Sequence, residues 1–146
     1  MLELRFNSES KRIIEEFIIS RVEKAKANGV VLGLSGGVDS SLVAKLCASA
    51  LGNKNVLALI MPFSNDEDIK DAIEYAKKLG IRYKIISIDE ILKACKNCLS
   101  KTNKKSIGNL KARIRMLLLY AYANSKNLIV VGTGNKTELL CGYFTK

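Results

Sequence analysis

The chain has 146 residues, of which 48% are hydrophobic and 26% are charged, and its formal net charge is +10. This length suits one domain with one sizeable core, and the composition is ordinary for a soluble globular protein. The sequence contains no histidine, which excludes catalysis by a histidine side chain, including the Ser-His-Asp triad.

The start of the chain and its cysteines indicate a compartment. The first residues, MLELRFNSES, are too polar for a signal peptide, and no apolar run approaches the length that spans a membrane. We therefore expect a cytoplasmic protein without a membrane partner. Reduced thiols are then expected at the four cysteines, Cys47, Cys95, Cys98 and Cys141.

Helix-like and strand-like segments alternate along the chain. Helical spacing of apolar residues predicts helices over about residues 8–28, 39–51, 66–79, 89–98 and 109–125, with another beginning near Asn135. Apolar runs predict strands over residues 30–34, 56–61, 82–88 and 128–131. Residues 100–108 are polar and basic, and we expect a loop there. The alternation predicts an α/β fold, a doubly wound parallel sheet with helices on both faces.

Two of the predicted strands run directly into glycine turns, Ser35-Gly36-Gly37 and Gly132-Thr133-Gly134. Right-handed crossovers place the turns after parallel strands at one edge of the sheet, and ligands bind at that edge where the strand order switches. We therefore expect these strands to be neighbours, with the functional site between them. The long helix is expected to direct five residues inward, Leu110, Ile114, Leu117, Leu118 and Ala121.

The first glycine turn has the properties of an anion site. Its glycines permit a positive φ and let a ligand approach the backbone closely. Free N–H groups at the start of the next helix, with the positive end of its dipole, favour a phosphate. Asp39 would repel phosphate oxygens, and Mg²⁺ resolves this conflict because it commonly bridges the two. The alternative is a plain capped turn, in which Ser35 and Asp39 serve only backbone N–H groups.

The net charge is concentrated in the later part of the chain. Residues 1–90 carry 13 basic and 13 acidic side chains, whereas residues 91–146 carry 11 basic side chains and one carboxylate, Glu138. This distribution predicts either a solvated basic face or an electropositive surface for a nucleic acid or a phosphorylated small molecule.

Three motifs resemble one family. SGGVDSS, residues 35–41, resembles the pyrophosphate loop of the ATP pyrophosphatases, which cleave ATP to AMP and pyrophosphate. GNLKARIRM, residues 108–116, resembles the G-N-x-x-A-R-x-R-M segment of NAD synthetases, and GTGNKTE, residues 132–138, continued by GYFTK, is similar to their second signature. With Met61-Pro62, the resemblance covers the chain from about residue 10 and implies the adenine-nucleotide α-hydrolase fold.

The resemblance implies ammonia-dependent synthesis of NAD from deamido-NAD. The nicotinate carboxylate attacks the α-phosphorus of ATP, pyrophosphate leaves, and ammonia displaces AMP from the acyl adenylate. Phosphoryl transfer needs positioning and charge neutralisation more than a proton-transfer residue, so no catalytic side chain is assigned. The family's usual homodimer is implied as well.

Roles for particular residues follow from the same resemblance. ATP contacts fall on Gly33, Leu34, Ser35, Gly36, Gly37, Val38, Asp39, Ser40 and Thr133. Mg²⁺ ligation falls on Asp39 and Glu138, and deamido-NAD contacts fall on Arg113 and Lys146. Arg113 and Arg115 cannot share one helix face, so at most one points at the site, and the motif favours Arg113. The simpler interpretations are a solvated Arg113 and a Glu138 that only stabilises the first turn of a helix.

The family normally continues beyond the point at which this sequence ends. The resemblance therefore implies a single ATP pyrophosphatase-type domain over residues 1–146 that lacks the family's C-terminal part. One alternative is a tRNA-thiolating enzyme that binds RNA with its basic half and uses Cys95 and Cys98 for sulfur or a cluster. Residues 101–115 have no aromatic side chain to stack on bases, which disfavours a nucleic acid. The other alternative is a nucleotide-binding fragment without catalysis.

Overall fold

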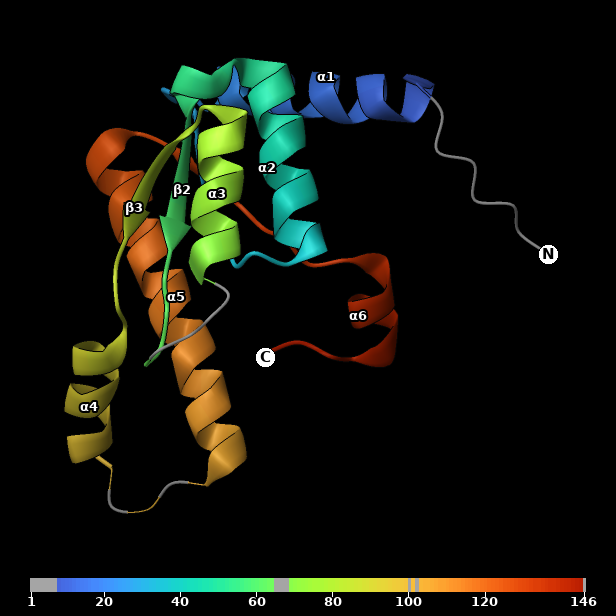
Figure 1. Cartoon of the computed structure of the whole chain (residues 1–146). Helices are drawn as coiled ribbons and strands as arrows, with labels where there is room; N and C mark the ends of the chain where they lie inside the picture. Colours follow the sequence, from blue (N-terminus) through green and yellow to red (C-terminus); the bar gives the residue numbers. More distant parts are fainter. Residues whose placement is uncertain (1–7, 65–68, 100, 102, 146) are drawn as a thin grey trace.

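The computed structural model describes residues 8–64, 69–99, 101 and 103–145. These residues form a parallel four-stranded sheet in the order β3-β2-β1-β4 (Figure 1). The strands are β1 (Val30–Gly33), β2 (Val56–Ile60), β3 (Arg82–Ile85) and β4 (Ile129–Val131). The helices are α1 (Ser8–Lys24), α2 (Val38–Leu51), the 3-10 turn η1 (Asn53–Asn55), α3 (Ile69–Leu79), α4 (Asp89–Asn97), α5 (Lys104–Lys126) and α6 (Lys136–Cys141).

Helices cover both faces of the sheet, as the alternation of segments predicted. Val30 and Leu32 point to one face and pack with Ala44 and Cys47 of α2, next to α1 and α3. The side chain between them, Val31, points to the other face, where Leu92 of α4 and Ile114 of α5 cover it. In Figure 1, α2 and α3 lie in front of the sheet and α5 lies behind it. The doubly wound fold and the pairing of β1 with β4 are both confirmed.

The boundaries of several elements differ from the predicted ones. Helix α5 begins at Lys104, so most of the expected loop over 100–108 is helical. The side chain of Asn103 caps this helix by accepting the N–H of Ser106 at 2.8 Å, and a helix so capped tolerates the glycine in its second turn. The predicted strand over 82–88 ends at Ile85. The helix expected from about residue 66 is described from Ile69, and its predicted start lies outside the described residues.

The inward face of α5 was only partly predicted. Ile114 is buried and Leu118 is half-buried, but Leu117 is 60% exposed and Ala121 is also exposed. Ala123 is buried in their place. Apolar residues follow one another closely over residues 114–123 of this helix, so periodicity alone does not determine which side meets the sheet.

None of the helices among the described residues combines the length and the hydropathy that crossing a bilayer requires. The four cysteines are all free thiols, and Cys47 is buried in the core.

Candidate functional site

The turn between β1 and α2 is built from hydroxyl groups and glycines. The Oγ of the buried Ser40 lies 3.0 Å from the Oγ of Ser35 and donates to the Gly37 carbonyl at 3.0 Å. Gly36 has φ +88°, in the left-handed region that favours glycine. Gly37 is the N-cap of α2, and no side chain caps the helix. The first N–H groups of α2 are therefore available to an anion.

Asp39 turns away from this cap and reaches the second glycine turn. Its Oδ2 accepts a hydrogen bond from Asn135 Nδ2 at 3.2 Å, between residues 96 positions apart. The interpretation as a plain capped turn therefore does not hold for Asp39. Ser35 does accept the N–H of Gly37 at 3.3 Å, but its Oγ also contacts Ser40 Oγ, so it does not serve backbone N–H groups alone. The contact between Asp39 and Asn135 ties the two glycine turns together at the edge where β1 and β4 end.

Glu138 lies on the other side of Asn135. Asn135 is the N-cap of α6: its Oδ1 accepts the Glu138 N–H at 2.9 Å, and Glu138 Oε2 accepts the Asn135 N–H at 3.0 Å. This capping box satisfies two N–H groups that would otherwise lack partners. Glu138 thus stabilises the first turn of a helix, as the simpler interpretation predicted. Asn135, its partner in the capping box, also bonds to Asp39 and so connects the two carboxylate residues.

Asp39 and Glu138, the two predicted Mg²⁺ ligands, offer carboxylates, a type of ligand that Mg²⁺ takes in proteins. Among the described residues, no group of three or more acidic, cysteine or histidine side chains could hold a metal ion. Mg²⁺ keeps several waters and is usually held by one or two carboxylates plus substrate phosphates. The exposed Asp39 and the half-buried Glu138, next to an anion-binding turn, match this donor set.

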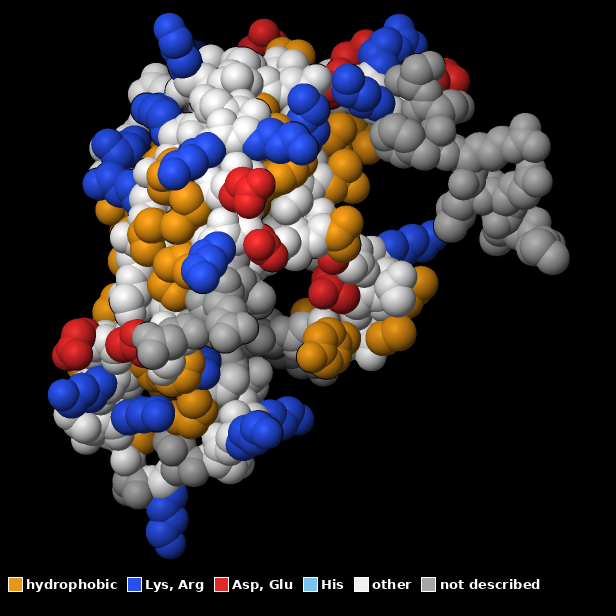
Figure 2. Space-filling model, viewed as in Figure 1, with side chains coloured by type: hydrophobic (Ala, Val, Ile, Leu, Met, Phe, Trp, Pro, Cys, Tyr) orange, Lys and Arg blue, Asp and Glu red, His pale blue; other side chains and the backbone are white. Residues whose placement is uncertain are grey.

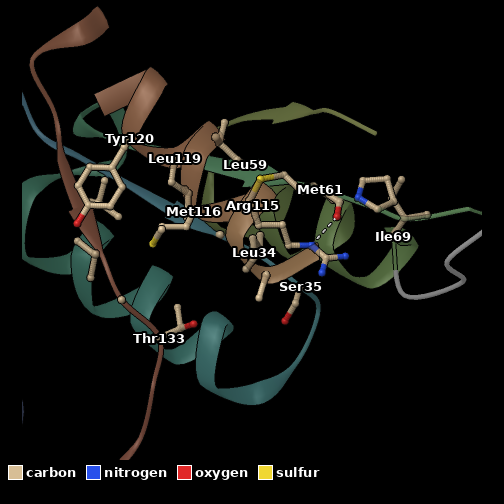
Figure 3. Close-up of a pocket in the computed structure, with 17 residues that line it drawn as sticks. Leu34, Ser35, Leu59, Met61, Ile69, Arg115, Met116, Leu119, Tyr120 and Thr133 are labelled. Carbon is tan, nitrogen blue, oxygen red and sulfur yellow. Dashed lines mark hydrogen bonds between the residues drawn. The ribbon is translucent and has the colours of Figure 1, made fainter. Parts of the chain in front are cut away.

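A pocket of about 670 Å³ opens beside the β1–α2 turn. The carboxyl ends of β1, β2 and β4 form its floor and α5 forms a wall (Figure 3). Its apolar lining includes Leu59, Met61, Ile69, Leu119 and Val130. Polar groups come from Ser35, Arg115 and Thr133, and from the hydroxyl of Tyr120. Such a site suits a ligand with an apolar ring, and Ser35 connects it to the turn that suits a phosphate.

The sequence model of the NAD synthase family matches residues 11–146. The chain belongs to the NAD synthase family. One curated relative, the NH(3)-dependent NAD(+) synthetase of Archaeoglobus fulgidus, is 49% identical over 146 residues, which cover 98% of this chain and 59% of the relative.

Solved structures of relatives share the fold. The NH3-dependent NAD synthetase from Campylobacter jejuni, in complex with the nitrate ion, has a TM-score of 0.88 and 48% identity over 92% of this chain and 59% of its own. The NMN synthetase from Francisella tularensis has a TM-score of 0.90 and 38% identity over 97% of this chain and 60% of its own. The chain therefore spans less than two thirds of the length of these relatives.

The residues that the family resemblance assigned to ATP lie together. Gly33, Leu34, Ser35 and Thr133 line the pocket, and residues 36–40 form the adjoining turn and the start of α2. Arg113 is exposed on α5 and is not part of the pocket lining, so its contact with deamido-NAD stays a prediction. Lys146 lies outside the described residues.

Arg115 is the polar residue that sequence reasoning passed over. It is half-buried, its Nε donates to the Met61 carbonyl at 3.0 Å, and it lines the pocket (Figure 3). One signal was available in the sequence, because the α5 residues that line the pocket recur at helical spacing: Ala112, Arg115, Met116, Leu119 and Tyr120. Of the two arginines in the family motif, the one that faces this pocket is Arg115.

Basic side chains gather away from the glycine turns. Figure 2 shows Lys and Arg over α4 and the start of α5, at the lower end of the molecule, and hydrophobic side chains on α6. Three exposed lysines, Lys101, Lys104 and Lys105, lie at the start of α5. The basic side chains at this end therefore form a solvated face, whereas Arg115, from the same half of the sequence, lines the pocket.

Proposed function

We propose that this chain is the ATP-binding part of an ammonia-dependent NAD synthetase. The enzyme would amidate deamido-NAD through an acyl adenylate and release AMP and pyrophosphate. The observation that carries the proposal is the junction of an anion-binding turn with an apolar pocket at the β1–β4 switch. Membership of the NAD synthase family and relatives that are named NH(3)-dependent NAD(+) synthetases support the same reaction.

ATP is expected to lie across the junction. Its adenosine fits the pocket beside Met61 and Arg115, and its phosphates fit the turn over residues 33–40, near Thr133. The N–H groups at the start of α2 then stabilise the charge of the departing pyrophosphate. Mg²⁺, when bound by Asp39 and Glu138, would supply further charge neutralisation. These roles need no proton-transfer side chain, in agreement with a sequence that has no histidine.

Deamido-NAD is expected to reach the exposed flank of α5. Arg113 lies there with Leu117, which is 60% exposed, and with Tyr120, which also lines the pocket and is 54% exposed. In a homodimer that uses this flank, Arg113 would contact the dinucleotide near the subunit boundary, together with Lys146. Free ammonia is the expected nitrogen donor, and the free thiols fit a reducing compartment such as the cytoplasm.

The same chemistry has a second possible product. The relative from Francisella tularensis is named an NMN synthetase and aligns with 97% of this chain. Amidation of nicotinate mononucleotide would give NMN through an equivalent acyl adenylate. Assays that compare this substrate with deamido-NAD therefore belong in the same experiment.

The test follows AMP and NAD by chromatography. The protein is incubated with Mg-ATP and ammonium, with and without deamido-NAD or nicotinate mononucleotide. We expect AMP and NAD to appear together with deamido-NAD, and Asp39→Asn to abolish both. The matched control is Asp71→Asn, an exposed carboxylate in the first turn of α3, which should leave the rate unchanged.

Three results would assign a different function. AMP that forms only with tRNA would favour the tRNA-thiolating alternative. NMN in place of NAD would move the substrate to the mononucleotide. ATP binding without AMP under any combination would mean that this chain is a nucleotide-binding part, and activity of a chain extended to the length of its relatives would then restore the proposal.

A further inference from the structure

The segment after β2, residues 61–64, begins in the wall of the pocket. Met61 and Pro62 line the pocket, and Phe63 and Ser64 follow them. Pro62 has no N–H, so this segment cannot continue the regular hydrogen bonding of a parallel pair. What holds the segment in place therefore determines the shape of the pocket wall.

Hydrogen bonds from the residues after β3 hold part of it. The strands pair with Ile60 opposite Ile85, and beyond that pair Ile86 N–H donates to the Ile60 carbonyl at 2.9 Å. Ile88 N–H donates to the Pro62 carbonyl at 3.1 Å. In a parallel ladder the next donor would be Ser64 N–H and its acceptor the Ile88 carbonyl. In the structure the Ile88 carbonyl instead accepts the Leu92 N–H of α4 at 2.9 Å.

The side chain of Asp89 replaces the missing acceptor. Its Oδ1 and Oδ2 lie 3.0 and 3.2 Å from the Ser64 nitrogen and accept its N–H. Ser87 orients the carboxylate, because its Oγ donates to Oδ2 and accepts the Asp89 N–H at 3.1 Å. Ser64 has φ +54°, a conformation that a residue other than glycine keeps only when its surroundings impose it.

The carboxylate is well suited to remain charged. The hydrogen bonds from Ser87 and from the Ser64 N–H, and the positive charge of Lys111, lower the pKa of Asp89 below its usual value. From the other side α5 holds the same segment, through the bond from Arg115 to Met61 and through Lys111, whose Nζ lies 3.3 Å from the centre of the Phe63 ring. The segment is thus held between α5 and the start of α4.

We propose that Asp89 is a positioning residue for the adenosine half of ATP. By binding the Ser64 N–H it keeps residues 61–64 against the pocket, where Met61 meets the ligand. This role rests on the proposed function, because it assumes that adenosine occupies the pocket. Asp89 itself is not among the pocket-lining residues, so it acts through the backbone of this segment.

The test separates the two halves of ATP. Binding of AMP and of inorganic pyrophosphate to the 146-residue protein is measured by titration calorimetry, for the wild type and for Asp89→Ala. We expect AMP to bind about ten-fold more weakly to the variant, because Ser64 loses a charged acceptor. Pyrophosphate should bind within about two-fold of the wild type, since the β1–α2 turn makes no use of Asp89.

Matched variants complete the design. Glu90→Ala removes the neighbouring exposed carboxylate of α4 and should bind both ligands as the wild type does. Asp89→Asn keeps one acceptor oxygen and should recover part of the AMP affinity. Ser87→Ala keeps Asp89 but removes the hydroxyl that orients its carboxylate. We expect this variant to lose AMP affinity selectively, by a smaller factor than Asp89→Ala. It provides the test if Asp89→Ala does not fold.

The outcomes are distinguishable. Equal AMP affinity in the wild type and in Asp89→Ala would overturn this inference and leave the proposed function standing. A parallel loss of AMP and pyrophosphate binding would also overturn it, because that pattern indicates general destabilisation. A wild-type protein that binds neither ligand would overturn the proposed function and this inference together.

Discussion

Asn135 connects the two halves of the candidate site at the scale of single residues. Its backbone and Oδ1 form the capping box with Glu138, and its Nδ2 donates to Asp39. One amide side chain thus joins both predicted Mg²⁺ ligands and both glycine turns. Asn135 both caps α6 and bonds to the other glycine turn. We therefore expect a substitution of this residue to change stability and ligand binding together.

Asn135→Ala is predicted to weaken both properties. Loss of an N-cap side chain costs about 1 kcal/mol of stability, and Asp39 loses the donor that orients it. We expect a lower urea midpoint and weaker Mg-ATP binding by calorimetry. Thr137→Ala, at an exposed position of α6, is the control and should change neither. Unchanged Mg-ATP affinity in Asn135→Ala would contradict the coupling between the turns.

Cys47 predicts how stability depends on alkaline pH. Burial raises the pKa of this thiol from its ordinary 9.0 to about 11. Between these values the folded protein keeps a proton that the unfolded chain releases, so stability must fall as the pH rises through this range. The contribution of the protonated Cys47 thiol to the free energy of unfolding is fully present below pH 9.0 and is lost by about pH 11. Urea unfolding at several pH values should show this decline, and Cys47→Ala should reduce it.

Thiol reactivity provides an independent measurement of the same residue. The thiolate is the nucleophile, so iodoacetamide at pH 8 should label the exposed Cys98 and Cys141 and spare Cys47 until urea unfolds the chain. Mass spectrometry locates the labelled cysteines. Labelling of Cys47 in the folded protein would contradict the burial of its side chain in the core.

Helix α5 has an unfavourable charge distribution at the scale of whole elements. It is 23 residues long, and its first turn contains Lys104 and Lys105 and no acidic residue. Basic side chains at a helix N-terminus oppose the helix dipole. Asn103 compensates in part by capping the helix. The sequence-based start at residue 109 failed here for this reason: the charges suggested a loop, and one capping side chain outweighed them.

Reversing one charge at each end of α5 tests this balance. Lys104→Glu should raise the free energy of unfolding by about 0.5 kcal/mol, and Lys126→Glu, in the last turn, should lower it by a similar amount. Urea unfolding at low salt is the measurement, and both effects should shrink as salt screens them. Changes of the same sign in both variants would indicate that net charge, not the dipole, sets the stability.

At the scale of the whole molecule, local patterns predicted the architecture and long-range contacts did not follow from them. Apolar runs and glycine turns are local, so the parallel sheet and the pairing of β1 with β4 could be predicted. The rotation of α5 about its axis depends on packing against the sheet, so Arg115 was missed. The bonds from Asn135 to Asp39 and from Ser64 to Asp89 join residues 96 and 25 positions apart, and no local pattern encodes them.

The exposed flank of α5 leads to a prediction about the assembly. Leu117 and Tyr120 are 60% and 54% exposed, next to Arg113. If a second copy covers this flank in the proposed homodimer, a charge introduced there would be buried without a partner and would strongly disfavour association. Leu117→Glu should then yield monomers in analytical ultracentrifugation at concentrations at which the wild type sediments as a dimer.

The control for this variant is Ile85→Glu, which places the same charge at another exposed apolar residue, 48% exposed on the edge strand β3. It should leave the sedimentation of the wild type unchanged. If Leu117→Glu separates the subunits and also weakens deamido-NAD binding while AMP binding persists, the dinucleotide lies near the subunit boundary and Arg113 faces it. Dimers that survive Leu117→Glu would exclude this flank from the interface, and the assignment of Arg113 to the substrate would then rest on the family motif alone.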